Sequence, residues 1–191
     1  HLVIGTPMYG GMCTSEYTQS LLNLSESANK SDVKLTTIFL GNESLIQRGR
    51  NTVAHHFMNL PDATHLLFID ADIKFRVEDI VKMIQADKSL IIGPVALKGY
   101  NWNEIRQAAV NGEDDIGRTG GVFNINRLPG VDMVSENEPF EIEHGGNAFM
   151  MIRRDCFETL KPHTPIYTNG GRSLPDGVEI KDYFRVEINK D

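Results

Sequence analysis

Short apolar runs recur along the first half of the chain, and each is bounded by turn residues or charged residues. There are four such runs, at 2–7, 34–40, 65–69 and 90–95. Runs of this length that lack a polar alternation are typical of strands buried on both faces, as in parallel sheets. We therefore expect four buried strands, of which the run His65-Leu66-Leu67-Phe68-Ile69 is the strongest.

Amphipathic stretches separate these runs. Apolar residues at helical spacing predict helices over 14–28, 45–59 and 77–84. Thr14 or Ser15 is expected to cap the first helix and Ser44 the second, because their hydroxyls can accept the free amides of a first turn. Strands that alternate with helices in this way need crossover connections. The pattern therefore predicts an α/β fold with a mostly parallel central sheet and helices on both faces.

The pattern changes beyond Gly99. We expect a polar helix over 102–110, a Gly- and Asp-rich stretch over 112–121, a strand over 148–152, a helix over 154–160 and no clear helix after it. The length of 191 residues fits one domain. We interpret it as a single domain, 1–191, with a nucleotide-binding half over 1–98 and a second half over 99–191 that carries specificity.

Composition narrows the choice of partners. The 26 acidic residues exceed the 19 basic ones, so the formal charge of -7 gives no overall field that would attract a nucleic acid. Cys13 and Cys156 form neither a disulfide framework nor a zinc spacing, which favours a reducing compartment, and we expect both to be buried. No apolar run has the roughly 20 residues that a membrane-spanning helix needs.

The chemistry is concentrated at the end of the strongest strand. Asp70-Ala71-Asp72 directly follows 65–69, and ligands of open α/β sheets bind beyond the carboxyl ends of the strands. With two carboxylates separated by one residue, one can bind a metal while the other reaches a ribose or the metal's water shell. Hard cations, Mg²⁺ or Mn²⁺, suit these oxygen ligands. The alternative is a turn that caps the next helix.

Two segments resemble the GT-A family of glycosyltransferases, which use nucleotide-diphospho-sugars. Arg48-Gly49-Arg50-Asn51 lies about 20 residues before the Asp70-Ala71-Asp72 motif, and Glu143-His144-Gly145-Gly146-Asn147 precedes the strand at 148–152. The resemblance spans about residues 2–160. It is closest to the amino-terminal domain of a large glycosyltransferase encoded by chlorella viruses, and it implies a GT-A (Rossmann-like) fold.

The resemblance implies roles for the nucleotide-binding half. The loop after the first strand, Thr6, Pro7, Met8 and Tyr9, would lie around the base and ribose. Asn51 would help to hold the nucleotide sugar. Arg48, Arg50 or both would face the diphosphate, because a planar guanidinium suits paired phosphate oxygens. Asp70 and Asp72 would bind the donor through the cation, with Ala71 alongside.

The resemblance also implies roles for the second half. His144 would complete the metal site with Asp70 and Asp72. Residues lining the donor sugar would be Gly93, Pro94, Gly145, Gly146 and Asn147. Asp72 and Arg50 would stabilise the leaving group. An inverting enzyme also needs a carboxylate base, for which Glu143, Glu141, Asp176 and Glu179 are candidates. Lys181-Asp182-Tyr183-Phe184 resembles the segment before the usual acidic motif, but no Glu-Asp pair follows.

The expected activity is metal-dependent transfer of a hexose from a UDP-sugar, with UDP-glucose as the first candidate, to a carbohydrate acceptor. The viral resemblance implies a glycan on a structural glycoprotein, cytoplasmic machinery and further domains in a longer protein. The donor sugar, the acceptor and the stereochemistry stay open. A nucleotidyltransferase is an alternative, although Met8-Tyr9-Gly10-Gly11-Met12 lacks the basic residue of its signature. A non-catalytic nucleotide-sugar-binding module is another.

Overall fold

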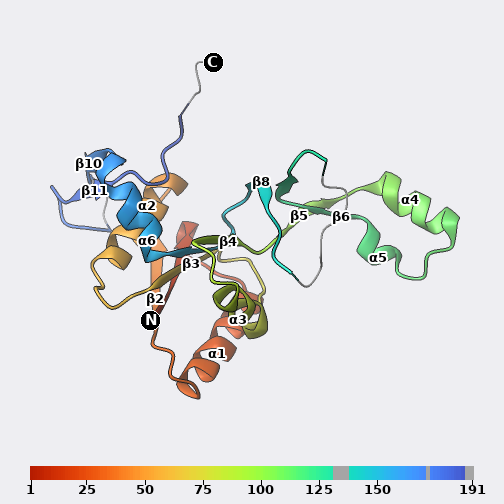
Figure 1. The fold of residues 1–191 in the computed structure, drawn as a ribbon, viewed down its shortest axis with the longest axis horizontal. Coiled ribbons are helices and arrows are strands. Elements are labelled where there is room, and N and C mark those ends of the chain that lie inside the picture. The colour runs from red at the N-terminus through yellow and green to blue at the C-terminus, as the bar shows by residue number, and fades with distance from the viewer. Residues whose placement is uncertain (131–137, 171–172, 188–191) are drawn as a thin grey trace. The chain divides into compact units, whose positions relative to one another are not determined.

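The structure, a computed structural model, describes residues 1–130, 138–170 and 173–187 (Figure 1). The strands are β1 (Leu2–Met8), β2 (Leu35–Gly41), β3 (His65–Ile69), β4 (Leu90–Ile92), β5 (Ala96–Tyr100), β6 (Gly121–Phe123), β7 (Ile125–Arg127), β8 (Ile142–Gly145), β9 (Phe149–Arg153), β10 (Ile166–Thr168) and β11 (Glu179–Lys181). The helices are α1 (Ser15–Asn29), α2 (Ile46–Met58), α3 (Val77–Gln85), α4 (Trp102–Asn111), α5 (Ile116–Thr119) and α6 (Arg154–Leu160), with short 3-10 turns η1 (Tyr9–Gly11) and η2 (Lys161–His163).

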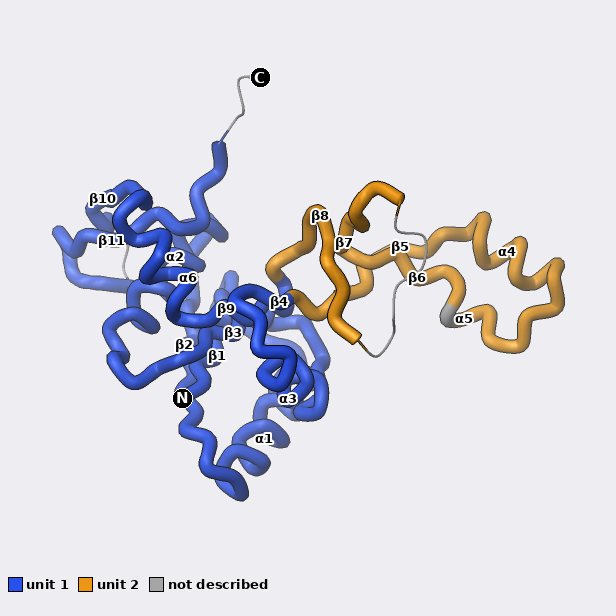
Figure 2. Tube along the Cα trace, in the orientation of Figure 1, with its two compact units in different colours: residues 1–91, 148–191 blue, residues 92–147 orange. Residues whose placement is uncertain are grey.

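The chain forms two compact units (Figure 2). The first unit combines residues 1–91 with 148–191, and the second unit consists of residues 92–147. These bounds do not coincide with the division at residue 98 that the sequence suggested. The reason is that β9 and α6, although late in the sequence, belong to the first unit and β9 lies within its sheet.

The first unit is built on a five-stranded sheet in the order β2-β1-β3-β9-β4. β1 runs parallel to β2 and to β3, with Gly5 opposite Ile38 on one side and Phe68 on the other. β9 is antiparallel to β3, with Phe68 opposite Met150. The expected α/β class and the parallel arrangement of the first three strands are therefore confirmed, while β9 makes the sheet mixed and separates β3 from β4.

Helices cover both faces of this sheet (Figure 1). On one face Tyr17 of α1 packs edge-on against Phe75, which stacks on Phe149 of β9 at 6.0 Å. On the other face the rings of Phe57 in α2 and Phe157 in α6 lie 5.6 Å apart. These aromatic contacts bury large apolar areas on each side of the strands, which is how the sheet acquires a core on both faces.

The helix starts show which caps form. The Thr14 hydroxyl accepts the amide of Tyr17 at 3.2 Å, which confirms the predicted cap of α1. The predicted Ser44 cap is wrong, because α2 begins at Ile46 after Leu45, with no side-chain cap. Instead, a carboxylate oxygen of Glu43 accepts the amide of Leu45 at 3.1 Å.

The two cysteines depart from expectation. Cys13 is exposed and Cys156 is partly exposed, and both are free thiols. The prediction that both are buried is wrong, because Cys13 lies in the loop before α1 and Cys156 in the first turns of the short helix α6. Within the described ranges, no helix is both long and apolar enough to cross a membrane.

The second unit contains two antiparallel strand pairs, β5-β6 and β7-β8, together with α4 and α5. The helix expected over 102–110 is confirmed as α4. The side chain of Asn101 accepts the amide of Glu104 at its start, and Gly112 ends it in the left-handed conformation with φ 73°. A residue without Cβ is favoured there, because other side chains adopt this backbone at a cost.

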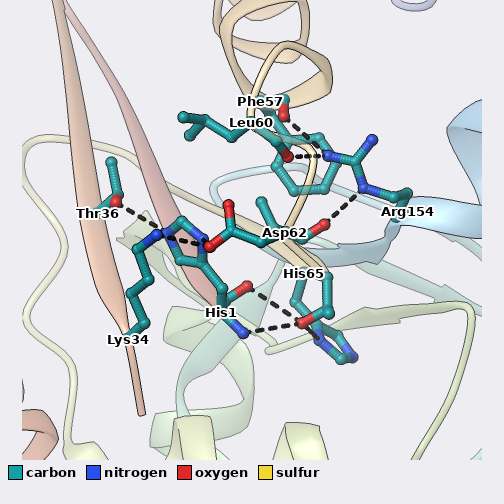
Figure 3. A network of polar contacts seen from close by, with 10 residues as sticks. His1, Lys34, Thr36, Phe57, Leu60, Asp62, His65 and Arg154 are labelled. Atoms are coloured by element: carbon teal, nitrogen blue, oxygen red, sulfur yellow. Dashed lines mark hydrogen bonds and ion pairs between the residues drawn. The ribbon is translucent and has the colours of Figure 1, made fainter.

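A network of polar contacts fixes the segment between α2 and β3 at the amino ends of the parallel strands (Figure 3). Arg154 donates to the carbonyl oxygens of Ala63 at 2.5 Å, Phe57 at 3.1 Å and Leu60, and its guanidinium lies over the Phe57 ring at 4.8 Å. Nearby, Asp62 accepts a hydrogen bond from Lys34 at 2.5 Å. A cation therefore adds a charged donor to the carbonyl groups at the carboxyl end of α2 and in the turn that follows it.

We expect Arg154→Ala to lower the free energy of unfolding by about 2–3 kcal/mol, because three carbonyl groups lose a charged hydrogen-bond donor and the Phe57 ring loses the guanidinium that packs on it. Urea unfolding followed by far-UV circular dichroism measures this loss. Fluorescence of the single tryptophan is a less direct probe, because Trp102 lies in the second unit and Arg154 in the first. Lys82→Ala, an exposed cation on α3, is the matched control. Equal stabilities of the two variants would contradict the capping role.

Candidate functional site

A pocket of about 520 Å³ lies in the first unit at the carboxyl ends of β1, β2 and β3. Its lining comes from the loops after these three strands and from the first turn of α2. The lining residues are Pro7, Tyr9, Met12, Cys13, Thr14, Glu43, Ser44, Ile46, Gly49, Asp70, Ala71 and Asp72. The carboxyl edge of an open α/β sheet is where such folds bind ligands, so the pocket is the leading candidate site.

Backbone contacts on two sides hold the Asp70-Ala71-Asp72 motif. The Asp70 amide donates to the carbonyl of Ala148 at 2.9 Å, and the Asp70 carbonyl accepts the amide of Ile73 at 3.1 Å. The carbonyl of Ala71 accepts the amide of Thr14 at 2.9 Å. The motif is thus a turn fixed between the residue before β9 and the start of α1. It brings Asp70 and Asp72 to one pocket.

Within the motif, the side chain of Asp70 forms an ion pair with Arg50 of α2. Nη2 of Arg50 donates to Oδ1 of Asp70 at 2.8 Å, and the guanidinium carbon lies 5.0 Å from the centre of the Phe68 ring. Phe68 and Asp70 are two residues apart on an extended segment, so both point to the face that α2 covers. The side chain of Arg50 is 1% exposed, whereas that of Asp70 is 31% exposed.

The electrostatics of this pair depend on Asp70. Burial lowers the pKa of the Arg50 guanidinium from its ordinary value, and the charge of the Asp70 carboxylate opposes that shift. Among the described residues, Nε and Nη1 of Arg50 are buried and have no hydrogen-bond partner. Arginine stays protonated even so. Asp70 therefore supplies the hydrogen-bonded compensation for a buried positive charge.

The second arginine is also committed to a carboxylate. Arg48 donates through Nε and Nη2 to the two oxygens of Glu43, each at 2.6 Å. This contact lowers the pKa of Glu43, whose side chain is 6% exposed. Of the described residues, no lysine or arginine lines the pocket. Arg48 is paired with Glu43 and Arg50 is buried, and neither belongs to the pocket lining; the diphosphate contact that the resemblance implies for one of them stays a prediction.

The sequence interpretation missed Glu43. This residue follows the carboxyl end of β2 and lines the pocket beside the Asp70 turn. Because parallel strands end at the same edge, a charged residue three positions after the predicted strand, 34–40, signalled this location. Its bidentate bond to Arg48 fixes the carboxylate as part of the pocket wall.

Asn51 has a structural contact in place of the predicted ligand contact. Its amide nitrogen donates to Asp182 at 2.6 Å, and its amide oxygen accepts the amide of Phe184 at 2.9 Å. The ring of Phe184 packs on Phe68 at 5.3 Å. Asn51 is buried, and both ends of its amide are used to hold the 182–184 segment on α2.

The predicted loop after the first strand is wrong at Thr6, Pro7 and Met8, which are the last residues of β1, and the segment from Thr6 to Tyr9 is divided between core and pocket. Thr6 is buried, and its hydroxyl is 2.5 Å from that of Tyr17, so its predicted contact with a nucleoside does not fit. Met8 is the last residue of β1 and is not part of the lining. Pro7 and Tyr9 do line the pocket, and Tyr9 is 78% exposed. Tyr9 is therefore free to stack on a ligand.

The remaining predicted residues belong to the second unit. They are Gly93, Pro94, Glu143, His144, Gly145, Gly146 and Asn147. His144 is exposed on β8, with Nε2 at 4.0 Å from the Glu143 carboxylate. The amide of Gly146 donates to the carbonyl of Asn124 at 2.8 Å, and a Cβ at Gly146 would lie 2.3 Å from the Asn124 side chain. Their roles towards a donor stay predictions.

Metal binding also stays a prediction. Within the described part of the chain, no three His, Cys, Asp or Glu side chains are grouped as a ready metal site. The first unit instead offers carboxylate oxygens of Asp70 and Asp72 in one pocket. A cation held there would need further ligands from a substrate or from water.

Comparisons with known proteins add little. No protein-family model matches the sequence, and no curated protein matches it. Among solved structures, the chain is similar to one described as the crystal structure of A197 from STIV, with a TM-score of 0.49 and 16% identity over 83% of this chain and 67% of that chain. Similarity at this level supports neither a family nor a function.

Asp70 and Asp72 offer a matched comparison. Asp70→Ala should lower the free energy of unfolding by about 3 kcal/mol, at the low end of the range for breaking a buried ion pair because Asp70 is partly exposed. Asp72→Ala, at an exposed position, should cost about 1 kcal/mol or less. Urea unfolding followed by far-UV circular dichroism distinguishes them. A loss of about 1 kcal/mol or less for Asp70→Ala would show that Arg50 does not depend on Asp70.

Proposed function

We propose that this chain is the catalytic domain of a metal-dependent glycosyltransferase of the GT-A type, which transfers a hexose from a UDP-sugar to a carbohydrate acceptor. One observation carries the proposal: the pocket at the carboxyl edge of the sheet combines Asp70 and Asp72 with the exposed ring of Tyr9. Carboxylates suit a cation that binds a diphosphate, and an exposed tyrosine suits a base or ribose.

The charges around the pocket support metal dependence. Three carboxylates line it, from Glu43, Asp70 and Asp72, while no described lysine or arginine does. Arg48 and Arg50 partly compensate Glu43 and Asp70 from outside the lining, but a diphosphate in the pocket would meet the carboxylate oxygens themselves, and without a cation between them this contact is unfavourable at close range. The proposal therefore assigns the neutralisation of the diphosphate to Mn²⁺ or Mg²⁺ and not to an arginine.

The donor set fits such a cation. Mg²⁺ in nucleotide sites commonly has one or two protein carboxylates, substrate phosphates and several waters as ligands. The exposed carboxylate of Asp72 and the oxygen of Asp70 that does not face Arg50 would be the protein ligands. His144 belongs to the second unit, and its role as a metal ligand stays a prediction from the sequence.

Leaving-group stabilisation is the chemistry that the pocket supports best. When bound, a divalent cation supplies positive charge for the diphosphate that departs from the anomeric carbon. The chain's own residues would bind and orient the donor. Tyr9 and Pro7 would contact the nucleoside, and the Asp72 carboxylate would hold the cation to which the diphosphate binds. Glu43 is unsuited as the base that deprotonates an acceptor hydroxyl, because Arg48 holds both its oxygens. Glu143 remains the proposed base.

Two other functions make different predictions. A nucleotidyltransferase would need basic groups at the triphosphate, and the described pocket lining has none. A non-catalytic module would bind nucleotide and metal without any turnover. Release of UDP from UDP-glucose, with or without an added sugar acceptor, separates transferase chemistry from simple binding.

The direct test is calorimetric titration of UDP and UDP-glucose into the protein, with Mn²⁺ and then with EDTA. Binding should require the metal, and Asp72→Ala should abolish the metal-dependent part while leaving the circular dichroism spectrum unchanged. Glu78→Ala, an exposed carboxylate on α3 outside the pocket, is the control and should bind as the unaltered protein does. Metal-independent binding, or unchanged affinity of Asp72→Ala, would contradict the proposal.

A further inference from the structure

Arg50 occupies an unusual position for a charged residue. It lies in the middle of the α2 stripe that packs on the sheet, together with Val53, Ala54 and Phe57, all of them buried. The Phe68 ring lies beneath the guanidinium, and Nη2 bonds to Oδ1 of Asp70. Burial of a charge is costly, and such charges are generally paired. The stripe thus holds a cation against Asp70, which is one of the two motif carboxylates that line the pocket.

We infer that Arg50 is a positioning residue that acts on the ligand only through Asp70. It holds Oδ1 of Asp70 in place, so that the remaining oxygen is presented to the pocket in a fixed orientation. This inference rests on the proposed function for the identity of the ligand, a divalent cation with a nucleoside diphosphate. It replaces the direct contact between arginine and diphosphate that the sequence suggested.

Accessibility supports an indirect action. The side chain of Arg50 is 1% exposed and is not part of the pocket lining, whereas Asp70 is 31% exposed and is part of it. A diphosphate oxygen in the pocket would therefore meet Asp70 before Arg50. The guanidinium is itself restrained, by the Phe68 ring and by the surrounding helix stripe.

A fixed orientation of the Asp70 carboxylate would raise the affinity of the pocket for a cation. A carboxylate at a partly exposed strand end would otherwise exchange between rotamers, and ordering it would oppose cation binding. A buried partner that fixes the carboxylate removes that ordering step. Outer residues that orient metal ligands typically change metal affinity by about 10- to 100-fold when they are replaced.

The test is a double-mutant cycle with Arg50→Met, Asp70→Asn and the variant that carries both, using UDP with Mn²⁺ as the probe in calorimetry. Arg50→Met should weaken Mn²⁺-dependent UDP binding by about 10- to 100-fold. In the Asp70→Asn background the same replacement should change the affinity by less than about twofold, because the effect passes through Asp70. Arg50→Lys, which keeps a cation, should recover part of the loss.

Two results would overturn the inference. Unchanged UDP affinity in Arg50→Met would remove the positioning role, and a full further loss in the Asp70→Asn background would mean that Arg50 contacts the ligand directly. If Arg50→Met does not fold, Arg50→Lys replaces it in the cycle, with a smaller but still non-additive loss expected.

A second measurement is independent of the proposed function. Crystal structures of the unaltered protein and of Arg50→Lys or Arg50→Met should show one conformer of the Asp70 side chain in the former and several in the latter. One unchanged conformer in all of them would contradict positioning by Arg50. If the unaltered protein does not bind UDP with Mn²⁺, the proposed function fails, while this comparison still decides whether Arg50 positions Asp70.

Discussion

The buried ion pair between Arg50 and Asp70 is the constraint on which the candidate site depends. A guanidinium that is almost fully removed from water requires a negative partner, and the Oδ1 atom of Asp70, 2.8 Å away, provides it. The pair joins the middle of α2 to the carboxyl end of β3. The geometry of the pocket edge and the stability of the first unit are therefore linked through one contact.

Other residues of α2 connect the helix to further parts of the first unit. A Cβ at Gly5 would lie 2.4 Å from Val53, so the helix packs closely on β1 where glycine leaves room for it. Asn51 bonds to the 182–184 segment, and Arg154 caps the carboxyl end of the helix. One helix thus contacts the first strand, the third strand and the late part of the chain, so the pocket rests on rigid elements.

Much of the fold could be predicted because local patterns determine it. The strand at 65–69, the Thr14 cap and the helix at 154–160 follow from apolar periodicity and capping chemistry. The place of β9 beside β3 could not be predicted, because strand order depends on contacts distant in sequence. Asp70 and Asp72 meet in one pocket as expected. Arg50 was misjudged, although its spacing from Val53, Ala54 and Phe57 marks a buried helix position.

The central claim is that the carboxylate edge binds a cation together with a nucleoside diphosphate. The most direct measurement is a crystal structure of the protein soaked with Mn²⁺ and UDP, with anomalous diffraction data to locate manganese. The account predicts an anomalous peak beside Asp72 in the pocket, with the diphosphate bound to the same ion. No peak there, or UDP bound elsewhere on the protein, would contradict it.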